Sequence, residues 1–327
     1  MYIRNTLSAM TNPLPNVNHP ISNLQEALPS VMPPFSNILD SDQVGGQKYF
    51  NLIRYYGGKW KQLKYTLPYI EMVAKANDAR TYVECFGGGG KCILNLDTLE
   101  HKFQKAIYNE MDPYVCSIFQ AVSDPDMAQQ MFEIMTQLDF SRETFNYCRQ
   151  HKTDTDNSLL VKASMTFALV QMGFNGQLKT FAGDKTAELL KDRYKNSCKK
   201  ILEAPEHLRN VEVINGDYRK LMKKYGSDTQ VVKYLDPPYH PSTRNRQALD
   251  TYPNELSVND HKELVEILCN SRSWVLSGYD PAQYGCDDYK PLEDSGAVKE
   301  SIGMFLVSSS NKSEGSVRKE EFIWYKY

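Results

Sequence analysis

The chain has 327 residues, enough for one large α/β domain with a smaller lobe or for two domains. Hydrophobic residues make up 41% and charged residues 24%, a balance that excludes a wholly disordered or fibrous chain. The formal net charge is −2, so a nucleic-acid partner would have to be bound by a local basic surface. No stretch approaches about 18 apolar residues. We therefore expect no membrane span and a cytoplasmic protein.

Cysteine and histidine are too scattered to form a recognisable framework. The 7 cysteines include no C-x-x-C pair, and the 6 histidines form no paired ligand pattern with them. This spacing argues against disulfides and against a zinc site. We expect a reducing intracellular setting and no metal.

The first 47 residues differ from the rest in composition. They are rich in Pro, Asn and Ser, carry few charges and show no helical or strand period. We interpret residues 1–47 as a flexible leader, although a docking segment for a partner is an alternative.

Beyond the leader, short apolar runs alternate with amphipathic stretches. The runs ending in polar or glycine-rich turns predict buried strands at 81–86, 105–110, 211–215, 231–236 and 273–278. The longer stretches predict helices at 113–122, 158–171, 186–203 and 258–270. Such alternation indicates an α/β fold with a mostly parallel sheet covered on both faces. The stretch 124–205 lacks a convincing strand, which predicts an inserted helical lobe.

A glycine cluster follows the first predicted strand, in the sequence Tyr-Val-Glu-Cys-Phe-Gly-Gly-Gly-Gly-Lys at 82–91. Glycines there let the backbone approach a ligand at the carboxyl edge of a parallel sheet. A phosphate-binding Walker A loop is excluded because positions 85 and 92 are both Cys, and Cys92 also breaks the dinucleotide pattern. A tight turn without a ligand is the competing interpretation. Glu110 ends the next predicted strand, about 20 residues on, where a carboxylate can accept hydrogen bonds from ribose hydroxyls.

The third motif is Asp-Pro-Pro-Tyr at 236–239, directly after an apolar run. Two prolines remove two N–H donors and stiffen the turn, so the Asp carboxylate and the neighbouring carbonyls form a fixed set of acceptors. The tyrosine adds a flat π face. Acceptors beside a face suit a planar group with an amino nitrogen, although a rigid turn at a strand end is the alternative.

Five motifs occur in an order that resembles one enzyme family. They are Arg-Tyr-Tyr-Gly-Gly-Lys-Trp (54–60), the glycine loop, Asn-Glu-Met-Asp-Pro (109–113), Asn-Gly-Asp-Tyr (215–218) and Asp-Pro-Pro-Tyr. Together they resemble the Dam-like adenine-N6 DNA methyltransferases, over about 54–327. The resemblance includes Leu-Ser-Gly-Tyr-Asp (276–280), a terminal strand at 320–327, and a Phe-Asn element of the recognition lobe at Phe174, Asn175, Gly176 and Phe181.

The resemblance implies a Rossmann-like methyltransferase sheet of seven strands with an inserted, mostly helical recognition domain. It implies S-adenosylmethionine as methyl donor, a catalytic domain at 48–123 and 206–327, and a recognition domain at 124–205. The leader at 1–47 is not part of the family pattern. Glu110 would hold the ribose, Asp217 would lie beside the adenine ring, and the 86–90 loop would pack by the methionine moiety. The residues implied to contact the donor are Tyr55, Lys59, Glu84, Phe86, Gly87, Gly88, Gly89, Glu110, Asp217 and Asp236.

The resemblance also implies a mechanism centred on Asp236, Pro237, Pro238 and Tyr239. Asp236 and the Pro237 carbonyl would accept hydrogen bonds from the target amino group and free its lone pair for in-line methyl transfer. A base inside duplex DNA cannot reach such a site, so it would be flipped out and stacked on Tyr239. Four glycines followed by Lys91 are unusual for this family's loop.

Contacts to double-stranded DNA are expected from the lobe and from the loop after the Asp-Pro-Pro-Tyr motif. Residues 179–200 contain seven Lys or Arg against three acids, a local balance of +4, which suits phosphates although a solvated helix face competes. The expected DNA-contacting residues are Asn175, Lys179, Arg244, Arg246 and Tyr252.

We expect a site-specific DNA adenine-N6 methyltransferase, a monomer or weak dimer, from a restriction-modification, phage or regulatory setting; a phage enzyme would act in the host cytoplasm. One alternative is an RNA adenine-N6 methyltransferase, whose chemistry is the same. Another is a non-catalytic DNA-binding protein on a methyltransferase scaffold, although the glycine loop and Asp-Pro-Pro-Tyr are both intact. A protein-amide methyltransferase would more typically carry Asn at position 236.

Overall fold

The computed structural model describes most of the chain beyond the predicted leader. The described residues are 43–44, 47–55, 59–176, 178–183, 187–244, 255–306 and 318–327, the side chains of 43, 44, 47, 175 and 187–189 excepted. Arg246 and Tyr252 lie outside them, as does most of the leader. Two short paired strands, β1 (Gln43–Val44) and β2 (Gln47–Lys48), stand where the leader was predicted to end.

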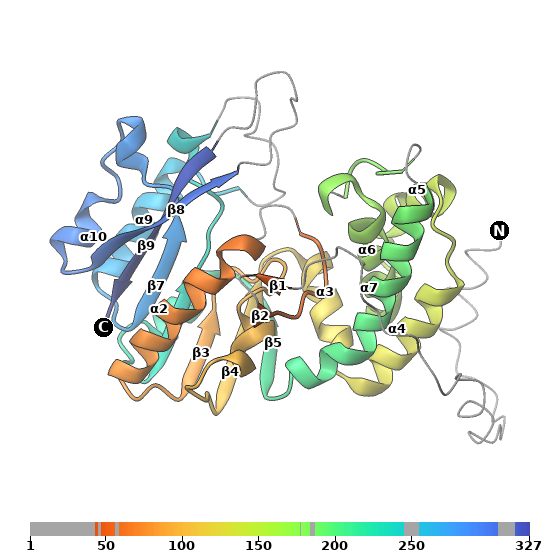
Figure 1. Ribbon diagram of the computed structural model, residues 1–327, viewed down its shortest axis with the longest axis horizontal. Coiled ribbons are helices and arrows are strands. Elements are labelled where there is room, and N and C mark those ends of the chain that lie inside the picture. Colours follow the sequence, from red (N-terminus) through yellow and green to blue (C-terminus); the bar gives the residue numbers. More distant parts are fainter. Residues whose placement is uncertain are drawn as a thin grey trace.

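A seven-stranded sheet forms the centre of the molecule, with the strand order β5-β4-β3-β6-β7-β9-β8 (Figure 1). The first five strands in this order are parallel, and β9 runs antiparallel to both of its neighbours. The strands are β3 (Thr81–Glu84), β4 (Lys105–Glu110), β5 (Val211–Asn215), β6 (Val231–Leu235), β7 (Trp274–Gly278), β8 (Val298–Leu306) and β9 (Arg318–Lys326). The predicted α/β fold with a mostly parallel sheet is confirmed.

Helices cover both faces of this sheet. One face packs against α2 (Leu63–Ala76) and α3 (Pro113–Val122). The other packs against α8 (Tyr218–Tyr225), α9 (Val258–Cys269) and α10 (Lys290–Asp294). Successive side chains of a strand point to opposite faces of the sheet, so one strand contributes to both cores. On β3, Tyr82 belongs to the first core and Val83 to the second.

Four further helices follow α3 and lie beside the sheet in Figure 1. They are α4 (Pro125–Gln137), α5 (Arg142–His151), α6 (Leu159–Met172) and α7 (Ala187–His207). Asp124, Ser141 and Ser158 cap the first three by accepting backbone N–H bonds. Their buried residues belong to the same core cluster as α2 and α3, so this helical region shares a core with one face of the sheet.

Most predicted elements match the structure closely. Helix α3 has the predicted bounds, and the five predicted strands are present within one or two residues. The prediction that 211–215 is a buried strand is wrong, because β5 is the edge strand and is only half-buried. Among the described residues, no helix is both long and apolar enough to cross a membrane.

Candidate active site

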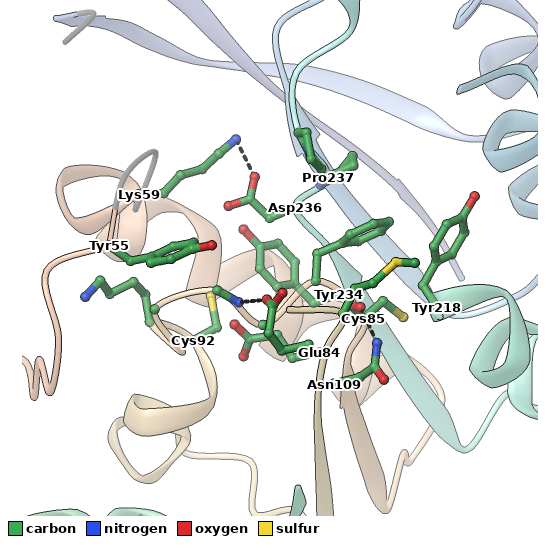
Figure 2. A pocket seen from close by; sticks show the side chains of 18 of the residues that line it. Tyr55, Lys59, Glu84, Cys85, Cys92, Asn109, Tyr218, Tyr234, Asp236 and Pro237 are labelled. Atoms are coloured by element: carbon green, nitrogen blue, oxygen red, sulfur yellow. Dashed lines mark hydrogen bonds and ion pairs between the residues drawn. The ribbon is translucent and has the colours of Figure 1, made fainter. Parts of the chain in front are cut away.

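A pocket opens where β3, β4 and β6 end, at the carboxyl edge of the parallel strands (Figure 2). This is the edge at which α/β sheets bind ligands. Most of the predicted site residues share this one pocket, although they come from distant parts of the chain. Those that line it are Tyr55, Lys59, Glu84, Phe86, Gly87, Gly88, Gly89, Glu110, Asp236, Pro237, Pro238 and Tyr239.

The glycine loop leaves β3 and lies close against the ring of Tyr108 on β4. A Cβ atom on Gly87 would stand 2.3 Å from Tyr108 Cε2, so only glycine fits there. The Tyr108 hydroxyl donates to the Gly88 carbonyl at 2.8 Å. Gly88 itself has a φ of +47°, a left-handed conformation that glycine adopts readily. The loop is therefore held in one shape by the neighbouring strand.

Glu110 fixes the loop from the other side while facing the pocket. Its Oε2 accepts from the Gly88 backbone N–H at 2.7 Å, and its Oε1 accepts from the Asp112 N–H at 2.8 Å. Burial raises the pKa of Glu110 to about 7, although these backbone hydrogen bonds oppose the rise. Only the ionised carboxylate so placed can accept hydrogen bonds from two hydroxyl groups of a ligand, because protonation turns one of its oxygens into a donor.

Lys91, the unusual residue after the glycines, has a structural partner. Its Nζ donates to the Ile53 carbonyl at 2.6 Å and to the Asn51 side chain. These bonds hold the segment that carries Tyr55, which lines the pocket. Lys91 thus connects the glycine loop to the segment that precedes it in sequence by about 40 residues.

Glu84, at the end of β3, is a buried acid beneath the loop. Its Oε2 accepts from the Ile93 N–H at 2.7 Å and from the Tyr82 hydroxyl at 3.2 Å. Burial raises the pKa of Glu84 to about 8. Its bonds to β3 and to the helical turn after the loop anchor the floor of the pocket.

Asp236 is held by two partners that both bond to one of its oxygens. Lys59 Nζ lies 3.0 Å from Asp236 Oδ1, and Ser277 Oγ donates to the same oxygen at 3.3 Å. Figure 2 shows the Lys59 and Asp236 side chains pointing toward one another. Burial raises the pKa of Asp236, and Lys59 opposes the rise. The second oxygen, Oδ2, is therefore the one placed to accept from an amino group.

The ring of Tyr239 is fixed on one side. It stacks on Tyr279 with ring centroids 4.0 Å apart and planes inclined by 13°. Tyr279 comes from the segment after β7 and is largely buried. Lys59 Nζ also lies over the Tyr239 ring, 4.9 Å from its centroid. Because Tyr279 covers one face, a planar ligand that stacks on Tyr239 would use the face opposite Tyr279.

Asp217 does not line the pocket, whereas its neighbours Gly216 and Tyr218 do. Its carboxylate caps α8 by accepting from the Arg219 N–H at 2.9 Å, and it forms an ion pair with the Arg219 side chain. The aromatic wall at this end is formed by Phe86 and Tyr218, whose ring centroids are 4.7 Å apart.

Asn109, on β4, joins the segments that follow β3 and β5 at the same end of the pocket. Its Nδ2 donates to the Cys85 carbonyl at 2.9 Å and to the Gly216 carbonyl at 3.0 Å. Among the described residues, its Oδ1 and the Tyr218 hydroxyl have no hydrogen-bond partner although both atoms are buried. Buried polar atoms are usually satisfied, so these two fit a pocket that takes a polar ligand.

Of the predicted DNA-contacting residues whose side chains the structure describes, neither Lys179 nor Arg244 lines the pocket. Arg244 donates to Glu255 at 2.7 Å and its side chain is 8% exposed, so a phosphate contact would require this pair to open. Lys179 is exposed, and its carbonyl accepts from Arg149 at 3.1 Å. Asn175 lies in the short helix Phe174–Gly176, where its side chain is not described.

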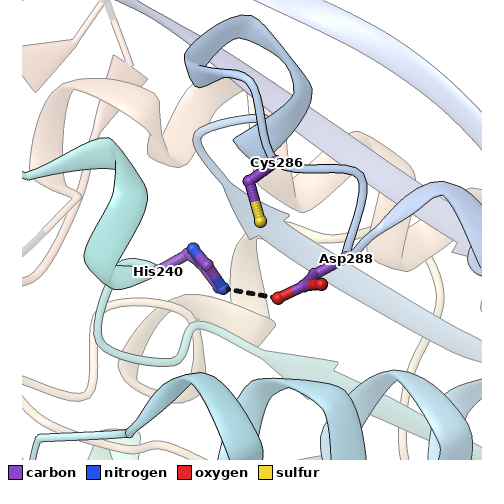
Figure 3. Close-up of side chains that lie close together, drawn as sticks. All are labelled: His240, Cys286 and Asp288. Carbon is purple, nitrogen blue, oxygen red and sulfur yellow. Dashed lines mark hydrogen bonds and ion pairs between the residues drawn. The ribbon is translucent and has the colours of Figure 1, made fainter.

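One group of metal-ligating side chains comes together among the described residues. The donor atoms of His240, Cys286 and Asp288 lie within 4.8 Å of one another (Figure 3). His240 Nδ1 accepts from the Ser242 backbone N–H at 3.2 Å, so the proton is on Nε2, which donates to Asp288 Oδ2 at 3.2 Å. In this tautomer Nε2 has no lone pair for a metal, and the lone pair of Nδ1 already accepts from Ser242. The group anchors the residue after Asp-Pro-Pro-Tyr and does not line the pocket.

A comparison with known protein families covers the motifs that line this pocket. A family model described as D12 class N6 adenine-specific DNA methyltransferase matches residues 55–280, which is more than half of the chain. No curated protein matches the chain. The matched range contains the glycine loop, Glu110 and the Asp-Pro-Pro-Tyr motif, and these features meet in one pocket. The chain therefore belongs to the D12 class of N6 adenine-specific DNA methyltransferases.

Proposed function

We propose that this adenine-specific methyltransferase transfers a methyl group from S-adenosylmethionine to an adenine flipped out of duplex DNA. The observation that best supports this proposal is that Glu110 and Asp236 line one continuous pocket, with the glycine loop between them. A donor bound across this pocket would bring its ribose to Glu110 and its methyl group toward Asp236. The two unsatisfied atoms, Asn109 Oδ1 and Tyr218 Oη, support a polar, aromatic group at the Phe86 end.

The donor supplies an electrophilic methyl group on a positively charged sulfur. Asp236 Oδ2 and the Pro237 carbonyl accept the two amino hydrogens of the adenine, which directs the nitrogen lone pair at that methyl. The new N–C bond forms as the C–S bond breaks, and the sulfur keeps the bonding pair and becomes neutral. The amino group, which now carries the positive charge, then passes one proton to Asp236 Oδ2, and from there the proton leaves to water. The contribution of the protein is mainly positioning, because Lys59 and Ser277 already fix Asp236.

The adenine must leave the DNA helix, because a base that is stacked inside the duplex cannot enter a pocket at the edge of the sheet. Tyr239 would replace part of the lost stacking through the face opposite Tyr279. Phosphate contacts would come from the helical region α4–α7, which we propose as the recognition domain over 124–205 within the catalytic domain 48–123 and 206–327. Lys179 and Asn175 of that region remain our candidates for DNA contacts, as do Arg244, Arg246 and Tyr252.

The test is methyl transfer from labelled S-adenosylmethionine to unmethylated duplex DNA, with structured RNA in parallel. We expect label on DNA adenine, and we expect Asp236→Ala to abolish transfer while donor binding persists. Asp236→Asn is the matched variant, because it keeps the shape of the acceptor but replaces one acceptor oxygen with a donor. Label on RNA alone would contradict the substrate, and full activity of folded Asp236→Ala would contradict the mechanism.

A further inference from the structure

A buried acid that the motifs do not include stands behind the pocket. Glu321 lies on β9, is fully buried, and does not line the pocket itself. Its Oε1 accepts from Lys59 Nζ. The Tyr239 hydroxyl lies 3.4 Å from both Glu321 oxygens, at the long end of hydrogen-bond range. One carboxylate therefore contacts two residues that do line the pocket.

Lys59 lies between this acid and Asp236. Its side chain is 5% exposed, and its ammonium contacts both carboxylates. Burial alone would lower the pKa of Lys59, but Asp236 and Glu321 raise it above its ordinary value, so the ammonium stays charged. With all three groups ionised, one positive charge faces two negative charges. The triad of Lys59, Asp236 and Glu321 then carries one net negative charge.

The reaction changes the charge of the ligand beside this triad. The proposed donor is a sulfonium cation, and its demethylated product is a neutral thioether. We propose that Glu321 offsets the charge of Lys59 so that the Asp236 end of the pocket keeps a net negative charge, which favours the cationic donor over the neutral product. Glu321 would thus determine specificity between donor and product without touching either. This inference rests on the proposed function.

The size of the effect follows from Coulomb's law. Two unit charges about 10 Å apart at an effective dielectric constant of about 20 interact strongly enough to change an affinity about tenfold. The other charged residues at the pocket are Glu84, Glu110, Lys91 and Arg219, and they bond to residues other than Glu321. Glu84 accepts from the Ile93 N–H, and Glu110 accepts from the Gly88 and Asp112 N–H groups. Lys91 bonds to Ile53 and Asn51, and Arg219 forms ion pairs with Asp217, Asp260 and Glu263. They are unchanged by a substitution at position 321.

The experiment measures the dissociation constants of S-adenosylmethionine and S-adenosylhomocysteine by calorimetry on the full chain. Glu321→Gln keeps the shape of the side chain and removes its charge. We expect the preference for donor over product to fall about tenfold. Glu320→Gln is the matched control, since Glu320 is the preceding residue on β9 and bonds instead to Ser301 and Gln283. Its preference should equal that of the wild type.

An equal loss of affinity for both ligands in Glu321→Gln would overturn the inference, because a merely structural role acts on both alike. Wild-type affinities for both ligands in this variant would overturn it too, since the preference would again be unchanged. If the wild type fails to bind S-adenosylmethionine at all, the proposed function itself fails, and that result is distinct from the other two.

A second variant keeps the inference testable if Glu321→Gln does not fold. Lys59→Gln removes the positive charge and makes the triad more negative. This variant should lower the affinity for both ligands, because contacts are lost, but it should raise the ratio of donor affinity to product affinity. The double variant Lys59→Gln with Glu321→Gln restores one net negative charge and should return the preference toward the wild-type value. A preference that falls in Lys59→Gln would overturn the inference.

Discussion

At the scale of single residues, the site depends on carboxyl groups whose partners differ. Glu110 accepts from two backbone N–H groups, whereas Asp236 is held by Lys59 and Ser277. Burial raises the pKa of both acids, but only Asp236 has a cation beside it to oppose the rise. Glu110, with a pKa of about 7, titrates near neutral pH, as does Glu84 beneath the loop, with a pKa of about 8.

Donor binding should depend on pH through Glu110. Its pKa is about 7, and only the ionised form accepts hydrogen bonds from both ribose hydroxyls. As the pH falls from 8 to 6 the carboxyl becomes protonated, so we expect donor affinity to fall about tenfold. Calorimetry at the two pH values measures this. In Glu110→Gln binding should be weak at both pH values, and a wild-type affinity that does not change with pH would contradict the assignment.

At the scale of elements, the glycine loop depends on the strand beside it. The contact of Gly87 with the Tyr108 ring leaves no room for a side chain. We expect Gly87→Ala to displace the loop, to destabilise the fold by about 1–3 kcal/mol and to weaken donor binding. Gly278→Ala is the matched control, because a Cβ there meets nothing within 4 Å. Thermal unfolding and donor titration measure both, and equal behaviour of the two variants would count against the close approach.

The sequence predicted those elements whose patterns are strong. The apolar runs at 81–86 and 231–236 became β3 and β6, because buried strands of a parallel sheet are apolar on both faces. Strand β8 was missed because its residues, VKESIGMFL, are largely exposed and lack a clear period. Helix α2 was missed as well, and it contains Pro68 in its first turns.

The site was predictable where motifs are contiguous and not where it depends on packing. The glycine loop and Asp-Pro-Pro-Tyr can be recognised in the sequence because their residues are consecutive. Glu321 does not, because within the predicted strand at 320–327 an acid next to Glu320 looks like a solvated charge. Only the pairing of β9 with β7 and β8 reveals that it is buried against Lys59. Tyr279 and its stack on Tyr239 depend on the same assembly.

At the scale of the whole molecule, helix α7 presents a basic stripe. Lys191, Lys195 and Lys199 are exposed at four-residue intervals, while Tyr194 and Cys198 on the neighbouring face of the helix are buried. We expect the triple change of these lysines to Glu to weaken DNA binding. The slope of the logarithm of the affinity against the logarithm of the salt concentration should become less steep, by the equivalent of about two to three phosphate contacts. Donor binding should not change.

The matched control for the α7 stripe changes the same number of charges elsewhere. Lys75, Lys102 and Lys105 lie around the amino edge of the sheet, opposite the pocket, and are exposed. Their change to Glu should leave DNA affinity near the wild-type value when measured by salt-dependent titration. Equal losses in the two triple variants would show that net charge, and not the α7 surface, governs binding.

The ion pair between Lys59 and Glu321 joins residues that are 262 positions apart in the chain. Contacts of such long range form slowly, because the loop between them must be ordered before the contact brings any gain. Local helices and the first parallel strands can assemble while Lys59 still lacks its second carboxylate. During refolding, tight discrimination between donor and product should therefore return late, with the insertion of β9 between β7 and β8. Ligand preference would then report the completion of the sheet.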